Sequence, residues 1–321
     1  MTFNGNLLIT GGAGFIGSNL ADALIAQGGK VRIIDNLVTG YHENLDEISG
    51  DFEFIEGDLN DETALRRALE GVEVVFHEAA LPSVPRSVAN PKETHEACVN
   101  ATFKLLVAAK EAGVRRVIYA ASSSAYGDQP TLPKVETMRP EPLSPYAAAK
   151  LMGEYYCQVF TRVYGLETIS LRYFNVFGPR QDPGSMYSGV ISRFVDSLMG
   201  GKTPVIYGDG EQSRDFTFVA NVVNANIKAA QTMQGIGQVM NCSNGERISL
   251  IELLEVLKKI TGKTDVQAEF QTERAGDVKH SQADNSRAKE FLDYQKIVGL
   301  EEGLAQTINW WKQSRFAVNN S

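Results

Sequence analysis

The 321-residue sequence is poor in cysteine, in proline and in long apolar runs. Its three cysteines, Cys98, Cys157 and Cys242, are scattered and odd in number, so we expect no disulfide framework and no metal site. No apolar run reaches the length of a membrane-spanning helix, and the N-terminus carries no signal-peptide pattern. These absences predict a protein of the reducing cytoplasm that does not contact a membrane.

Positive charge is also scarce. Lys and Arg number 31 against 39 Asp and Glu, and the resulting net charge of −8 opposes binding to a phosphate backbone, so a nucleic-acid partner is not expected. Hydrophobic residues make up 43% and charged residues 22%, which is typical of a globular protein. At this length we expect one large domain or two closely joined domains.

The first half of the chain alternates short apolar runs with segments of helical periodicity. This alternation predicts an α/β fold with a doubly wound parallel (Rossmann) sheet covered by helices on both faces. Strands are expected at 7–10, 31–34, 52–55, 72–77, 114–121 and 167–172, and helices at 15–27, 61–69, 93–111 and 145–164.

The pattern changes after Asn175 to glycine, proline and polar residues, and no strand-helix alternation is expected before apolar segments at 216–219 and 239–241. An amphipathic helix follows Ser249, then a strand near 266–270 and helices near Ser286 and Leu300. We therefore expect a dinucleotide-binding Rossmann domain of residues 1–175 plus 215–245. A second, smaller α/β domain of residues 176–214 plus 246–321 would bind the substrate.

A glycine-rich turn follows the first strand, with Gly11, Gly14 and Gly17 at a three-residue spacing. Such glycines permit a tight turn, close approach of backbone N–H groups to a pyrophosphate and close helix–strand packing. Asp35 ends the second strand, where a carboxylate accepts hydrogen bonds from adenosine ribose hydroxyls and repels a 2′-phosphate. The sequence therefore predicts NAD rather than NADP.

Two further segments adjoin this predicted cofactor site. Asp58 follows the third strand, where it either accepts from the adenine amino group or caps the helix near Asp61. His77 ends the fourth strand and is interpreted as a packed histidine without a chemical role. The small residues Ala79 and Ala80 that follow let the chain pass close to a cofactor.

Tyr146 and Lys150 stand one helical turn apart, separated only by alanines, so a phenol and an ammonium share one helix face. Ser122, with Ser123 and Ser124 after it, ends the fifth strand. That strand end lies at the carboxyl edge of the sheet, where doubly wound folds bind ligands.

Together the glycine turn, the serine run, the Tyr146–Lys150 pair and the segment Leu171-Arg172-Tyr173-Phe174-Asn175-Val176 resemble the extended short-chain dehydrogenase/reductases, specifically the UDP-sugar 4-epimerases. The resemblance implies that NAD stays bound while C4 of the sugar is oxidised to a ketone and then reduced on the opposite face. Tyr146 would take the C4 hydroxyl proton, with its pKa lowered by Lys150 and the nicotinamide. Ser122 would hydrogen-bond the C4 oxygen, although Ser123 and Ser124 stay open for that role.

The resemblance also assigns binding residues. The residues expected to bind the cofactor are Gly11, Gly14, Phe15, Ile16, Gly17, Asp35, Asn36, Asp58, Leu59, Ala79, Ala80, Asn100, Tyr146, Lys150 and Tyr173. Arg214 and Arg274 would clamp the diphosphate, unless they form surface ion pairs, and Asp277 would bind the uridine ribose. The other residues expected to bind the substrate are Ser83, Arg86, Ser123, Ser124, Asn175, Val190, Tyr207 and Ser281.

The residue at position 281 bears on the size of the substrate. The resemblance places a gatekeeper at Ser281, where some family members carry a bulky tyrosine, and serine leaves room for a 2-acetamido group. Segment 81–87 looks like that of the epimerases that prefer N-acetylated sugars. The sequence therefore favours interconversion of UDP-GlcNAc and UDP-GalNAc, with UDP-glucose and UDP-galactose as weaker substrates.

Other functions compete with this one. UDP-glucuronate 4-epimerases, dehydratases and decarboxylases also oxidise C4, but the dehydratases and decarboxylases carry an acidic residue where this chain has Ser123 or Ser124. A net reductase and a non-catalytic dinucleotide sensor are further alternatives. The family also forms homodimers through two long helices, and we expect the same here, although Leu105, Leu106 and Val107 would equally suit a face against the sheet.

Overall fold

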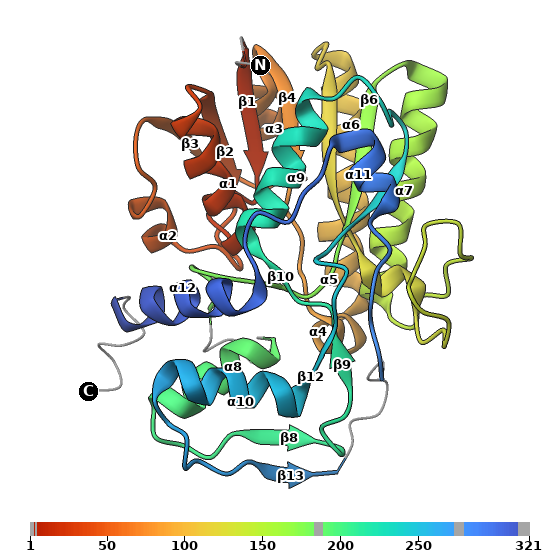
Figure 1. Ribbon diagram of the computed structural model, residues 1–321. Coiled ribbons are helices and arrows are strands. Elements are labelled where there is room, and N and C mark those ends of the chain that lie inside the picture. Colours follow the sequence, from red (N-terminus) through yellow and green to blue (C-terminus); the bar gives the residue numbers. More distant parts are fainter. Residues whose placement is uncertain (1–2, 4, 183–188, 273–278, 314–321) are drawn as a thin grey trace.

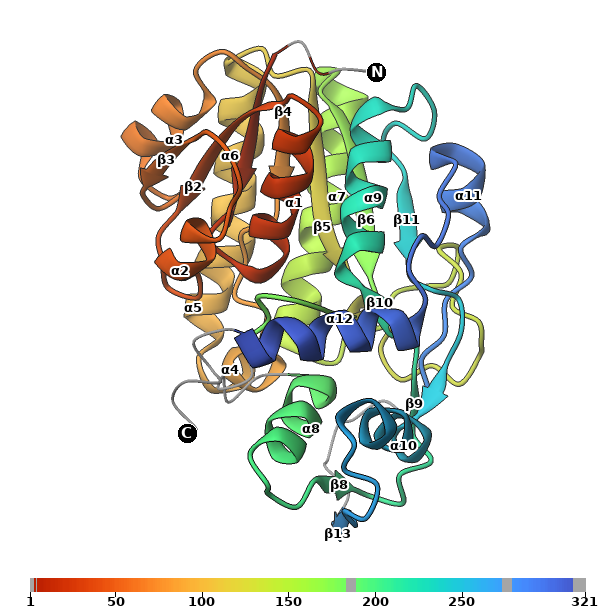
Figure 2. The same ribbon diagram turned by 60° about the vertical axis from the view of Figure 1, so that its left-hand side comes forward.

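The computed structural model describes residue 3 and residues 5–182, 189–272 and 279–313. Its centre is a seven-stranded parallel sheet in the order β11-β6-β5-β4-β1-β2-β3 (Figures 1 and 2). The order reverses between β1 and β4, where doubly wound sheets open a crevice at their carboxyl ends. The predicted fold class is confirmed. The strands are β1 Asn6–Thr10, β2 Lys30–Asp35, β3 Phe52–Glu56, β4 Val72–His77, β5 Arg116–Ser122, β6 Glu167–Tyr173 and β11 Val239–Cys242.

Helices cover both faces of the sheet because its strands are apolar on both sides. On one face α1 (Phe15–Ala26) and α9 (Val219–Gln231) bury their apolar residues against the sheet and one another. On the other face lie α3 (Glu62–Leu69), α6 (Ala101–Glu111) and α7 (Pro145–Tyr164), which share a second core with the sheet. Leu105 and Leu106 are fully buried in that second core, so they face the sheet rather than a partner.

The helix expected at 93–111 starts earlier and is interrupted. It consists of α5 (Pro91–His95), the π-helical turn η1 (Glu96–Asn100) and α6. A π-turn widens the helix by one residue while the apolar residues continue on both sides of it, so periodicity alone did not reveal it. Short helices α2 (His42–Asp46) and α4 (Val84–Ala89) and the 3₁₀ turn η2 (Ser123–Tyr126) complete this part.

The second part lies below the carboxyl edge of the sheet in Figure 1 and holds elements that the sequence analysis missed. Helix α8 (Val190–Met199) and strand β8 (Val205–Tyr207) occupy a stretch where no alternation was expected. The signal was present, because Ile191, Phe194, Val195 and Leu198 are buried at helical spacing. Helix α9 was also missed. In the apolar segment 216–219 only Thr217–Phe218 form a strand, β10, and α9 begins directly after it at Val219.

The remaining elements are β7 (Val176–Phe177), β9 (Ser213–Arg214), β12 (Ile248–Ser249), α10 (Leu250–Thr261), β13 (Glu269–Gln271), α11 (Ser286–Leu292) and α12 (Leu300–Gln313). Of these, α10, β13, α11 and α12 follow the expected order, whereas the short strands β7, β9 and β12 were not expected. Helix α12 contacts both α10 and β10, while α11 contacts α9 and β11. The domain boundaries given above stay a proposal, and the C-terminal helices join the two parts. No helix in the described ranges has both the length and the apolar character needed to cross a membrane.

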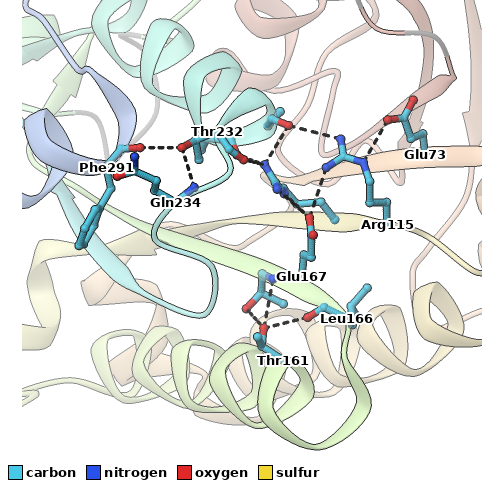
Figure 3. A network of polar contacts seen from close by, with 12 residues as sticks. Glu73, Arg115, Thr161, Leu166, Glu167, Thr232, Gln234 and Phe291 are labelled. Atoms are coloured by element: carbon cyan, nitrogen blue, oxygen red, sulfur yellow. Dashed lines mark hydrogen bonds and ion pairs between the residues drawn. The ribbon is translucent and has the colours of Figure 1, made fainter.

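An arginine network fixes the amino edge of the sheet, away from the carboxyl edge (Figure 3). The fully buried Arg116 pairs with Glu167 and donates to the carbonyl oxygens of Ala229, Ala230 and Thr232 at the end of α9. A guanidinium there satisfies carbonyl groups that the helix leaves unpaired. Its neighbour Arg115 pairs with Glu73 and Glu167 and so ties β4, β5 and β6 together.

Candidate active site

The glycine turn is closely packed, as a cofactor cradle requires. Gly11 has a φ of 71°, and a Cβ added there would lie 2.7 Å from the backbone of Ala79. A Cβ on Gly17 would lie 2.4 Å from the carbonyl oxygen of Gly11, and one on Gly14 would lie 3.1 Å from the same atom. Glycine is therefore needed at positions 11 and 17, and the backbone N–H groups at the start of α1 would face a pyrophosphate. The residues present therefore fit a dinucleotide.

Asp35 supports that turn from the end of β2. Its carboxylate accepts from the backbone N–H groups of Ala13 (2.9 Å) and Leu37 (2.8 Å). Burial raises the pKa of Asp35, and these two hydrogen bonds lower it. Each carboxylate oxygen has a further lone pair, so the predicted hydrogen bonds to ribose hydroxyls remain compatible with this arrangement.

Asp58 does not cap the next helix. That cap is Asp61, whose carboxylate accepts from the backbone N–H groups of Thr63 and Ala64. Asp58 instead accepts from Asn36 Nδ2 at 2.7 Å and from the backbone N–H of Asn60. Although burial acts to raise its pKa, these hydrogen bonds lower it. Asn36 and Asp58, both predicted to bind the cofactor, thus lie together beyond β2 and β3.

The end of β4 runs along the glycine turn. The fully buried His77 bonds Thr10 Oγ1 (2.7 Å) and Thr102 Oγ1 (2.9 Å), and burial lowers its pKa to about 3. His77 is therefore a neutral packed histidine, as interpreted. The backbone N–H of Ala79 donates to Thr10 Oγ1 at 3.3 Å, so the small residue lies directly against the turn.

Helix α7 is packed closely enough on the sheet to aim its first turns at the carboxyl edge. A Cβ on Gly153 would lie 2.2 Å from Tyr119 Oη, so glycine is needed for the close approach to β5. The buried pair Arg172–Glu154, with contacts of 2.8 and 2.7 Å, ties β6 to the same helix. Ser144 caps the helix by accepting from the backbone N–H of Ala147. These contacts fix the orientation of Tyr146 and Lys150.

Tyr146 and Ser122 lie together. Burial raises the pKa of the Tyr146 phenol, while a side-chain hydrogen bond with Ser122 lowers it. Ser122 Oγ also accepts from the hydroxyl of Ser124 at 2.8 Å and from its backbone N–H at 3.2 Å. Among the three serines expected at this position, Ser122 is thus the one in contact with the phenol, and Ser124 supports it.

Lys150 is 3% exposed and its ammonium donates to the carbonyl oxygen of Ala120 at 2.8 Å. The ammonium also lies over the ring of Tyr119, 5.1 Å from the centroid. Burial lowers the pKa of Lys150, while the negative charge of Glu78 is among the influences that raise it. The protein alone therefore does not lower the pKa of Tyr146, and the expected lowering depends on the charge that a cofactor brings.

Glu78 is a further titratable group of this site that the sequence analysis overlooked. Its carboxylate accepts from the hydroxyl of Tyr173 at 2.7 Å, and that hydroxyl accepts from Asn226 Nδ2 at 2.7 Å. Burial raises the pKa of Glu78 to about 7. Its place between His77 and Ala79 was visible in the sequence, but its contacts arise from β6 and α9.

A cavity of about 200 Å³ opens in the second part, beside β7, α8, β8 and β9. Four residues predicted to bind the substrate line it, namely Asn175, Val190, Tyr207 and Arg214. Gln181, Arg193, Gln212 and Phe216 also line it and were not predicted. Gln212 and Phe216 lie two residues before and after Arg214 in the sequence, so their proximity to that predicted residue was the only signal for them.

Ser281 and Asn175 meet beside this cavity. Asn175 Nδ2 donates to Ser281 Oγ at 3.1 Å, and the backbone N–H of Asp215 reaches the same oxygen at 3.5 Å. The Asp215 carboxylate accepts from the backbone N–H groups of Asn244, Gly245 and Ala283, each at 3.1 Å. A buried carboxylate thus fixes the loops that carry the predicted gatekeeper.

The loop after β7 is anchored on the Rossmann part. Arg180, 8% exposed, pairs with Asp22 at 2.6 Å and Glu47 at 3.1 Å, and Tyr41 donates to Asp182. Because Asp22 lies on α1 and Tyr41 and Glu47 flank α2, the loop beside the cavity is tied to the elements around the glycine turn.

The other predicted residues are less informative. Ser83 caps α4, and Arg86 forms a bidentate pair with Glu93, so both have partners within their own segment. Asn100 donates to Glu96 within η1. Arg274 and Asp277 lie outside the described residues. Phe15 and Ile16 pack partly buried against the core under α1 and α9, Leu59 is buried in the second core, and Ala80 packs partly buried beside Leu81.

Comparison with known proteins shows the family of this chain. The model of the NAD dependent epimerase/dehydratase family matches residues 7–243. A UDP-glucose 4-epimerase of Mycolicibacterium smegmatis is 41% identical over 309 residues, covering 95% of this chain and 98% of its own. A UDP-N-acetylglucosamine 4-epimerase from Methanobrevibacter ruminantium, solved with UDP-N-acetylmuramic acid, superposes with a TM-score of 0.92 at 41% identity, covering 96% and 98% of the two chains. A UDP-glucuronic acid 4-epimerase from Bacillus cereus, solved with UDP-glucuronic acid and NAD, gives 0.88 at 33%, covering 96% and 99%.

The glycine turn yields a testable prediction. In Gly11→Ala the new Cβ meets the Ala79 backbone as well as the strain of a positive φ, so the variant should lose bound NAD and unfold at lower urea concentration. Gly28→Ala is the matched control, because Gly28 has a φ of 80° but no atom within 4 Å of the added Cβ. It should lose only about 1–2 kcal/mol of unfolding free energy and keep its NAD, measured by absorbance of the released cofactor. Equal NAD content in both variants would contradict the close-approach argument.

Proposed function

Because the chain belongs to the NAD dependent epimerase/dehydratase family, we propose that it inverts C4 of a UDP-sugar through a transient 4-keto sugar. The observation that carries this proposal is the hydrogen bond between the Tyr146 phenol and Ser122 at the end of β5, on the same carboxyl edge of the sheet as the glycine turn after β1. A phenol and a serine hydroxyl that both reach the C4 oxygen of the sugar are suited to removing the proton of its hydroxyl and returning it. The resemblance to UDP-sugar 4-epimerases is confirmed by the comparisons.

The cofactor is NAD, which supplies a reversible hydride acceptor for C4 when bound. Gly11, Gly14 and Gly17 would hold its pyrophosphate, and Asp35 its adenosine ribose. Tyr146 would accept the C4 hydroxyl proton and return it, while Ser122 would hydrogen-bond the same oxygen. Lys150 would keep a positive charge beneath the site from its buried position on α7. Since no net oxidation results, the reaction needs no exchange of cofactor.

The substrate is proposed to be UDP-GlcNAc and UDP-GalNAc, with UDP-glucose and UDP-galactose as weaker substrates. Support comes from the small side chain of Ser281, which is held by Asn175 of the cavity lining and, unlike a tyrosine, would leave space for a 2-acetamido group. Arg214 lines the cavity and would clamp the diphosphate, together with Arg274. Incubation with UDP-GlcNAc, UDP-glucose and UDP-glucuronate separately, read by proton NMR of the anomeric and C4 signals, tests the order of preference.

A glucuronate 4-epimerase is the second candidate, because the Bacillus cereus enzyme is 33% identical to this chain. The experiment above separates the two, since this alternative requires turnover of UDP-glucuronate in preference to both neutral sugars.

Removal of the phenol should stop the reaction. Tyr146→Phe is expected to lower kcat by about 10²–10⁴-fold, the usual contribution of a general base, while the protein keeps its NAD. Tyr164→Phe is the matched control on the same helix, because Tyr164 is 53% exposed at the far end of α7. Turnover measured by NMR should be normal in the control. Wild-type kcat in Tyr146→Phe would rule out the phenol as the base.

The gatekeeper role can be tested at position 281. Ser281→Tyr should reject UDP-GlcNAc and keep UDP-glucose, because the ring would fill the space proposed for the acetamido group. Ser281→Ala removes the hydroxyl that accepts from Asn175 without adding bulk, so it should keep both substrates. The measurement is kcat/KM for each sugar. An equal loss of both substrates in Ser281→Tyr argues against a gatekeeper.

The chain is also proposed to form a homodimer through α7. Exposed apolar side chains follow one stripe of this helix at spacings of three or four residues, namely Met152, Tyr155, Val159 and Val163, which are 38%, 51%, 46% and 65% exposed. On the adjoining α6, Phe103 is 42% exposed and lies 5.1 Å from the ring of Tyr156. A contiguous apolar stripe of this kind is typical of an interface.

A charge placed in this stripe should prevent association. Val159→Glu is expected to elute as a monomer in size exclusion with light scattering, whereas the wild-type protein elutes as a dimer. Met233→Glu, at a 77% exposed position beyond α9, is the control and should stay dimeric. A monomeric wild-type protein would refute the proposed interface.

A further inference from the structure

Glu78 has no part in the function proposed above, although it lies among the proposed reacting groups. Its backbone N–H donates to the carbonyl oxygen of Thr10 at 3.1 Å, which fixes the residue where β1 and β4 diverge. Its carboxylate accepts from Tyr173, whose hydroxyl accepts from Asn226. Each hydroxyl and carboxylate contact is 2.7 Å long, so the side chain has one defined position between β4, β6 and α9.

Glu78 lies close to both proposed reacting groups of α7, because His77 before it pairs with Tyr119 of β5, and the next residue of β5, Ala120, accepts from Lys150. Tyr173, which donates to Glu78, pairs in turn with Ser122.

A negative charge on the Glu78 carboxylate raises the pKa of the Lys150 ammonium, and the ammonium lowers the pKa of Glu78 in return. The same charge raises the pKa of the Tyr146 phenol. The other titratable groups that face Glu78 are Tyr173 of β6 and the thiol of Cys242 of β11.

We propose that Glu78 is a positioning residue of the reaction, whose carboxylate holds Tyr173 and whose charge sets the pH range in which Tyr146 and Lys150 work. The proposal rests on the function proposed above. A negative charge makes a neutral phenol and an ammonium hold their protons more strongly. Ionised Glu78 therefore moves the titrations of both groups to higher pH, and it keeps Lys150 charged despite its burial.

The charge itself appears near neutral pH. Burial raises the pKa of Glu78 from its usual 4.5 to about 7, against the opposing influences of Tyr173 and Lys150. Because the folded state then binds a proton that the unfolded chain has lost, the stability that this proton contributes is complete below pH 4.5. It is lost as the pH rises through about 7. The rate should change its pH dependence in the same range.

Glu78→Gln tests this assignment, because the amide keeps the shape and an oxygen that accepts from Tyr173. In NAD-loaded protein, both limbs of the pH profile of kcat for Glu78→Gln should shift by about one pH unit toward acid, which is a tenfold change in rate at fixed pH. The bend in the profile that the titration of Glu78 produces near neutral pH should disappear. Tyr173→Phe keeps the Glu78 charge but removes a hydrogen bond that lowers the pKa of Glu78, so the bend should move to higher pH. A Glu78→Gln profile that superposes on the wild-type profile would overturn the proposal.

A second readout does not require turnover. The tyrosinate absorbance of NAD-loaded wild-type protein minus that of Tyr146→Phe isolates the titration of Tyr146, and the same difference is measured in the Glu78→Gln background. The Tyr146 titration should lie at lower pH without the carboxylate. If the wild-type protein inverts none of the three UDP-sugars, the proposed function fails while this measurement still decides the role of Glu78. If Glu78 were purely structural, Glu78→Gln would lower the melting temperature but leave the Tyr146 titration unmoved. That outcome would contradict the proposal.

Discussion

The site depends on the close contact between the glycine turn after β1 and the backbone after β4. Gly11 and Ala79 approach so closely that a single methyl group would not fit between them. Thr10 bridges the two segments, since its hydroxyl contacts His77 and accepts from the backbone of Ala79. The same contact leaves Glu78 facing Tyr173, so the cradle proposed for NAD and the charge beside it come from one piece of packing.

Loss of hydration dominates the electrostatics of this edge. Burial raises the pKa values of Tyr146 and Glu78 and lowers that of Lys150, so each group is pushed toward its neutral form. Fixed hydrogen bonds and neighbouring charges act against burial, among them Ser122 on Tyr146 and Glu78 on Lys150. Perturbed groups gathered at one sheet edge are characteristic of catalytic sites, where proton transfer requires pKa values near the working pH.

The two parts of the molecule are joined by polar contacts around the cavity. Arg180 ties the loop after β7 to Asp22 and Glu47, and the Asp215 carboxylate gathers three backbone N–H groups from two loops. Burial raises the pKa of Asp215 to about 7. The three hydrogen bonds act against burial, because they are strongest when the carboxylate is ionised. Asn175 and Ser281 inherit their positions from this anchor, which is how the second part shapes the proposed sugar pocket.

The amino-acid sequence by itself determined the sheet and the motif residues, because apolar periodicity and the glycine spacing act locally along the chain. Helix α7 begins and ends where predicted, and Ser122 ends β5 as expected. Local patterns did not reveal the π-turn before α6 or the role of Asp61 as the cap in place of Asp58, whereas α8 was missed although its apolar residues stand at helical spacing. Only the tertiary structure decided that Glu78 meets Tyr173 and that Ser281 meets Asn175, 106 positions apart, since such contacts depend on how distant segments pack.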